Sequence, residues 1–116
     1  MLVLTLPEDT SSRTFIADMF APIDYQLQVG SPFSVIIDSS QVSRVTLKQT
    51  MEVVAWMRAN RGRLAQCLTR SSIVVVNTLV ETALNTVFKL QKPVAPMLVV
   101  RDITSAHGFI WGHEEI

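Results

Sequence analysis

The 116-residue chain has a single cysteine, no long apolar run and none of the common glycine-rich motifs. Because Cys67 has no second cysteine to pair with, an internal disulfide framework is excluded and a reducing compartment is favoured. No apolar segment approaches the ~18–20 residues of a membrane span, so we expect no stable membrane insertion. The N-terminal segment lacks the basic residues and the long apolar stretch of a signal peptide. These absences predict a soluble, cytoplasmic protein.

Charged residues are also scarce, and their signs balance. Ten basic residues match ten acidic ones, and charged residues make up only 17% of the chain. The chain therefore has no general attraction for nucleic acid or for an anionic membrane, and we expect no nucleic-acid partner. Hydrophobic residues make up 48% of the sequence, which suggests that some apolar surface is covered in an oligomer. The length favours one domain spanning residues 1–116.

Signatures of catalysis and of metal binding are missing as well. The sequence has no phosphate-binding glycine loop and no nucleophile elbow. His107 and His113, the only histidines, lie six residues apart without cysteine or carboxylate at metal-ligand spacing, so we expect no metal and no cofactor. Cys67 lies among apolar residues, which favours an inert thiol over a nucleophile. Asp38 and Asp102 both follow expected strands and are a conceivable acid–base pair, but such residues usually cap the next element. We expect no enzyme.

Four apolar segments rich in β-branched residues predict strands, and they alternate with four segments of helical periodicity. The alternation predicts an α/β fold, with a four- or five-stranded, mostly parallel sheet and flanking helices. Pro22 should kink the first helix or divide it into two. The expected strands are Leu2–Leu6, Phe33–Ile37, Ser72–Asn77 and Met97–Val100. The expected helices run from about Phe15 to Leu27, from Thr46 to Asn60, from Leu79 to Leu90, and from Asp102–Ser105 toward Trp111.

The helix expected at Thr46–Asn60 has an unusually wide apolar face. At 100° per residue, a stripe facing the sheet is expected to contain Leu47, Met51, Val54 and Ala55. Val53, Trp56 and Met57 widen the apolar arc beyond what one sheet contact needs. Either the first helix also covers this helix, or its outer face is a subunit or partner interface, where Trp and Met are enriched. The candidate interface residues are Val53, Trp56 and Met57.

Polar side chains follow the ends of two expected strands. In open α/β sheets, ligands gather at the carboxyl ends of the strands. The candidate binding residues are therefore Asp38, Ser39, Ser40, Thr46, Lys48 and Asn77. The alternative is a purely structural role, because serines that follow a strand are usually turn and capping residues.

Several sequence features recur together in one known family. They are a strand ending at Asp38, a helix with Arg-x-x-Arg, a Ser-Ile-Val-Val-Val strand before a Leu-Val-x-x-x-Leu helix, and a closing Leu-Val-Val-x-Asp segment. In this order of elements the chain resembles the SpoIIAA-like family of small α/β domains, of STAS or SEC14 type. The resemblance covers roughly Phe20 to the C-terminus. It implies a domain that is often dimeric and works by protein contact. The phosphorylated serine of the antagonist proteins has no counterpart at residues 46–49, so a switch of that kind is not expected.

Two functions follow from this resemblance and from the apolar composition. The first is a non-enzymatic regulatory or scaffold domain that acts through protein–protein contact as a homodimer. The second is binding of a lipid or another apolar small molecule between helix and sheet, as the resemblance to SEC14 domains implies.

Overall fold

The four expected strands form one parallel sheet in the order β1-β2-β3-β4 within residues 1–111, the part of the chain that the computed structural model describes. The predicted α/β architecture is thereby confirmed. The strands are β1 (Leu2–Thr5), β2 (Phe33–Asp38), β3 (Leu68–Val74) and β4 (Met97–Val100). The helices are α1 (Phe15–Val29), α2 (Leu47–Ala59), α3 (Arg61–Cys67), α4 (Thr78–Leu90) and α5 (Ile103–Trp111).

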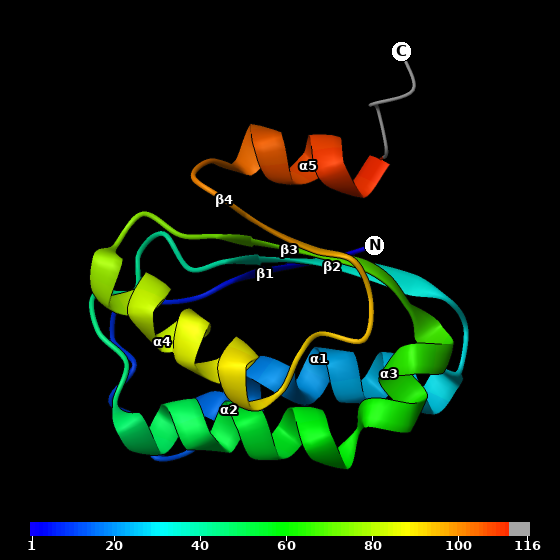
Figure 1. The fold of residues 1–116 in the computed structure, drawn as a ribbon, viewed down its shortest axis with the longest axis horizontal. Helices are drawn as coiled ribbons and strands as arrows, with labels where there is room; N and C mark the ends of the chain where they lie inside the picture. Colours follow the sequence, from blue (N-terminus) through cyan, green and yellow to red (C-terminus); the bar gives the residue numbers. More distant parts are fainter. Residues whose placement is uncertain (112–116) are drawn as a thin grey trace.

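The helices cover the two faces of the sheet unequally. Each strand pairs with the next one along the chain, and right-handed crossovers between such strands place all connecting helices on one face. Helices α1 to α4 accordingly lie together below the sheet, whereas α5 lies alone on the other face (Figure 1). The two faces therefore bury separate apolar clusters, a large one under α1–α4 and a small one under α5.

The pleat of β3 divides its side chains between these two clusters. Ser71 and Ile73 point to the α1–α4 side, where Ile73 joins the larger cluster. Ser72 and Val74 point the other way, and Val74 packs with Ala106 of α5. The alternation is the ordinary consequence of strand geometry, in which successive side chains leave opposite faces.

Helix α1 runs continuously through Pro22, so the prediction of two short helices is wrong. Proline removes one backbone hydrogen bond and costs roughly 3 kcal/mol in a helix interior. Phe20 and Ile23, on either side of it, are both buried, and tertiary burial of this apolar face outweighs the local cost. The helix ends at Gly30, whose φ of 82° lies in the left-handed region that glycine adopts without strain.

Helix α3 was not expected from the sequence. It follows α2 after the single residue Asn60, and it buries Leu64 and Cys67 against the larger cluster. Because the chain turns directly from α3 into β3, that strand begins at Leu68 instead of Ser72. The Thr69 hydroxyl donates to the carbonyl of Phe33 at 3.0 Å and helps to hold this early pairing with β2.

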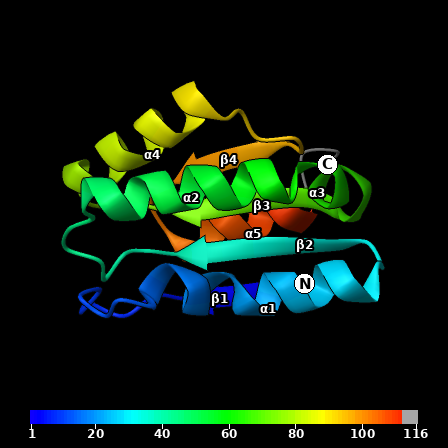
Figure 2. The same cartoon turned by 90° about the horizontal axis from the view of Figure 1, so that it is seen from below.

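Helix α2 presents a different face to the sheet from the one that the wheel suggested. Val54 is buried as expected, but Leu47 is 73% exposed, Met51 is 43% exposed and Ala55 is also exposed. The reason is that α2 lies between α1 and α4 and contacts both (Figure 2), so its sides are covered as well as its base. The apolar arc that faces inward is therefore wide and rotated away from Leu47 and Met51.

Candidate functional site

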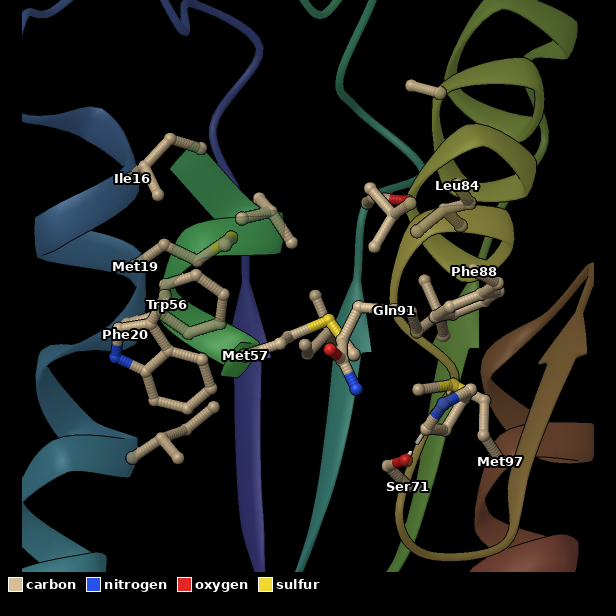
Figure 3. A pocket seen from close by; sticks show the side chains of 18 of the residues that line it. Ile16, Met19, Phe20, Trp56, Met57, Ser71, Leu84, Phe88, Gln91 and Met97 are labelled. Carbon is tan, nitrogen blue, oxygen red and sulfur yellow. Dashed lines mark hydrogen bonds between the residues drawn. The ribbon is translucent and has the colours of Figure 1, made fainter. Parts of the chain in front are cut away.

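An apolar cavity of about 160 Å³ lies between the α1–α4 layer and the sheet. Its lining comes from helices α1 to α4, from strands β2, β3 and β4, and from the adjoining loops. Figure 3 shows some of these side chains from close by. Nearly all of the lining residues are apolar. The polar exceptions are Ser39, Thr50, Ser71, Gln91 and Lys92.

One wall of the cavity is an aromatic stack between α1 and α2. The rings of Phe20 and Trp56 lie parallel, with their centroids 3.9 Å apart and 1° between their planes. The indole Nε1 of Trp56 donates a hydrogen bond to Asp24 Oδ1 at 2.9 Å. Because a buried indole needs a partner for its N–H, this bond fixes the orientation of the ring. The stack gives this side of the cavity a defined shape.

The opposite wall is formed by α4 and β4. Leu84 and Phe88 of α4, with Met97 of β4, face the α1–α2 side in Figure 3. Met57 and Gln91 lie between the two walls in this view, and both line the cavity. A methionine in that position is adaptable, because its unbranched thioether chain can change shape at little cost.

The three interface candidates on α2 all face this cavity. Val53, Trp56 and Met57 are half-buried and line its α2 side. Helix α1 covers Trp56 through Phe20, in agreement with the first of the two alternatives for the wide apolar arc, and the interface at these three residues stays a prediction. The outer surface of α2, which the interface prediction needed, is formed instead by Leu47 and Met51.

The strand-end candidates on β2 form a hydrogen-bonded turn. Ser39 is buried, and its hydroxyl donates to the carbonyl of Val74 at 2.6 Å. The backbone N–H of Ser40 donates to Asp38 Oδ1 at 3.0 Å. The Ser39 bond joins the end of β2 to the end of β3, and the Ser40 bond closes a turn on Asp38. The structural role is the better description of this turn.

Asn77 and Thr46 cap helices. The Asn77 side chain accepts from the N–H of Leu79 at 2.7 Å and donates to the carbonyl of Ser43 at 3.0 Å. Thr46 forms a capping box with Gln49 at the start of α2, and Gln49 also donates to the carbonyl of Thr10 at 2.6 Å. Both arrangements satisfy helix-end N–H groups.

Thr46 and exposed Lys48 border a polar surface groove beside the β1–α1 loop. Its charged residues are of both signs, namely Glu8, Asp9, Glu52, Arg13, Arg44 and Lys48. Hydrogen bonds from the side chain and backbone of Ser11 hold the pKa of Asp9 below its usual range. The mixture of charges gives the groove no preference for an anion or a cation.

The remaining candidate catalytic and metal-binding residues form no common site within residues 1–111. Asp102 accepts hydrogen bonds from Ser105 at the start of α5, as Asp38 does from Ser40, so each carboxylate serves its own turn. Cys67 is buried on the α1–α4 side of the sheet, whereas His107 belongs to α5 on the other side. His113 lies outside the described residues. Within residues 1–111, no group of three or more His, Cys, Asp or Glu side chains is placed to hold a metal ion.

Comparisons of the chain with protein-family models, with curated proteins and with solved structures gave no match. Among the helices of residues 1–111, none combines the length and the apolar character needed to cross a membrane. The site is therefore defined by its own geometry, as a partly open apolar pocket in an α/β domain.

Proposed function

We propose that this protein binds a small apolar molecule in the cavity between the α1–α4 layer and the sheet. The observation that carries the proposal is an apolar space of about 160 Å³ inside a domain of only 116 residues. An apolar ligand that fills this space takes the lining side chains out of contact with water, at roughly 25 cal/mol per Å² of apolar surface buried. Natural domains have only about 5–15 kcal/mol of stability in total, so such an occupant adds appreciably to it.

The volume limits the size of the ligand. An engineered cavity of about 150 Å³, lined by similar side chains, stays dry and binds benzene. A single six-membered ring, or a short branched chain, fits the present cavity in the same way. A phospholipid or a long acyl chain is larger than this volume, so a small apolar molecule is favoured over a lipid.

A titration with toluene tests the proposal. Trp56 lines the cavity, so its fluorescence should change saturably, and Trp111→Phe removes the signal of the other, exposed tryptophan. At a tenfold excess over the Kd, toluene should add about 1.4 kcal/mol of stability. This gain should raise the Tm by several degrees. A linear fluorescence response and an unchanged Tm, for toluene and benzene alike, would show that the cavity takes no ligand of this class.

A second candidate function is protein–protein contact in a homodimer. The position of β4, an apolar strand at the edge of the sheet, favours it. This strand is at the edge of the sheet and consists of Met-Leu-Val-Val, and Leu98 is 42% exposed. Edge strands present unpaired backbone groups that readily pair with another chain. Two copies related by a two-fold axis would pair β4 with β4. The resemblance to the SpoIIAA-like family is part of this proposal, since it too implies a dimer.

Light scattering behind size exclusion distinguishes this interface from one on α2. We expect a dimer that Leu98→Lys dissociates, because a lysine on the edge strand disfavours pairing. Met51→Lys is the matched control, since Met51 is 43% exposed on the outer face of α2. Dissociation by Met51→Lys alone would move the interface to α2, and a wild-type monomer at high concentration would remove the dimer proposal.

A further inference from the structure

Ser71 places one hydroxyl group in the wall of the apolar cavity. Its side chain points from β3 toward the α1–α4 layer, lines the cavity and is only 2% exposed. Its backbone N–H donates to the carbonyl of Pro96 at 3.0 Å, which holds the residue next to β4. Figure 3 shows the residue beside Met97 at the sheet side of the cavity.

The hydrogen bonds of Ser71 are weaker than those of the other hydroxyls that line the cavity. Ser39 donates to the carbonyl of Val74 at 2.6 Å, and Thr50 donates to that of Thr46 at 3.0 Å. Ser71 Oγ donates to the thioether sulfur of Met97 at 3.6 Å, and thioether sulfur is a weak acceptor. Among residues 1–111, no donor points to the lone pairs of Ser71 Oγ. Every buried side-chain N or O atom within residues 1–111 has a hydrogen-bond partner, Ser71 Oγ included, and the lone pairs of this hydroxyl can accept a further bond from a ligand.

We propose that the ligand is a neutral single-ring molecule with one hydroxyl group, and that this group donates a hydrogen bond to Ser71 Oγ. The inference rests on the proposed function, since it assigns the chemistry of the molecule in the same cavity. The hydroxyl of Ser71 keeps its bond to Met97 and accepts from the ligand at the same time. Phenols are the ligand class that this arrangement fits.

The rest of the lining supports a neutral ligand with a single polar group. The only charged side chain in the lining is Lys92, which is exposed in the loop after α4. A carboxylate placed near Ser71 would lose its hydration without gaining a charged partner, which is costly. Benzoate-like anions should therefore bind poorly, whereas a phenol needs only the one acceptor that Ser71 supplies.

Affinities for p-cresol and p-xylene test this inference, because the two molecules differ only in a hydroxyl in place of a methyl group. The measured quantity is the ratio of the p-xylene Kd to the p-cresol Kd. Ser71→Ala should lower this ratio by roughly 5- to 10-fold, the effect of one lost hydrogen bond. Ser72→Ala is the matched control, since Ser72 is the next residue of β3, points to the α5 side and donates to the carbonyl of Leu98 at 3.1 Å. It should leave the ratio unchanged, and circular dichroism verifies that both variants are folded.

The outcomes separate the inference from the function on which it rests. If both ligands bind but Ser71→Ala leaves the ratio unchanged, Ser71 does not recognise a hydroxyl and the inference is overturned, while the apolar binding function stands. If Ser72→Ala lowers the ratio as much as Ser71→Ala, the effect is a general loss of packing in β3, which also overturns it. If wild type binds neither ligand, the proposed function itself has failed.

Discussion

Replacement of Trp56 by alanine should lower the free energy of unfolding by about 3 kcal/mol, at the lower end of the range for truncating a large aromatic side chain. The variant loses the stack on Phe20, whose ring centroid lies 3.9 Å away, and the hydrogen bond from the indole to Asp24. We expect a loss at the lower end of this range of free energies because Trp56 is half-buried, not fully buried. Urea denaturation followed by far-UV circular dichroism measures the change without depending on tryptophan fluorescence.

Trp111→Ala is the matched control for this prediction. Trp111 is the other tryptophan of the chain, and it is 61% exposed at the end of α5. Its truncation should change the free energy of unfolding by no more than about 0.5 kcal/mol, as for most surface substitutions. Equal effects of the two substitutions would contradict the assignment of Trp56 to the wall of the cavity. A dimer that Trp56→Ala converts to a stable monomer would place this residue at a subunit interface instead.

Filling the cavity with a larger side chain should abolish ligand binding and stabilise the fold. Ala83 lies on α4, lines the cavity and is half-buried. Leucine is a good helix former, so Ala83→Leu adds carbon atoms to the cavity without disturbing α4. We expect the affinity for toluene to fall at least tenfold and the free energy of unfolding to rise by roughly 0.5–2 kcal/mol, the usual gain from cavity filling.

Ala55→Leu makes the same chemical change outside the cavity. Ala55 is exposed on α2, so the substitution should leave toluene affinity unchanged. Unchanged affinity in Ala83→Leu would show that toluene binds elsewhere. A marked loss of stability in Ala83→Leu would show that the side chain is forced against a filled core, because overpacking costs about 1–3 kcal/mol.

Much of the secondary structure could be predicted from the sequence, because it depends on local interactions. The apolar run after Pro32 forms β2, and helical periodicity marked α2 and α4 close to the bounds that the structure gives them. Helix α3 was missed because Arg61, Gly62 and Arg63 carry no apolar periodicity. Its formation depends on burying Leu64 and Cys67 under the neighbouring elements.

The site was only partly predictable. The width of the apolar face of α2 was visible in the sequence, and it marked Val53, Trp56 and Met57 as unusual. A helical wheel gives the angles between residues, but it does not say which angle faces the sheet. That direction depends on α1 and α4, which flank α2 on both sides. The same three residues line the cavity, and α1 covers Trp56, as one of the two alternatives left open by the sequence had it.

By itself, the sequence determined the alternation of four strands with four of the helices, and a mostly parallel sheet, since periodicity is a property of neighbouring residues. Only the tertiary structure decided where space remains between those elements, because the cavity is bounded by side chains from four helices and three strands. Ser71 and Ser72 illustrate the difference. They are identical neighbours in the sequence, and the way in which β3 pairs with β2 and β4 decides that Ser71 faces the cavity while Ser72 faces α5.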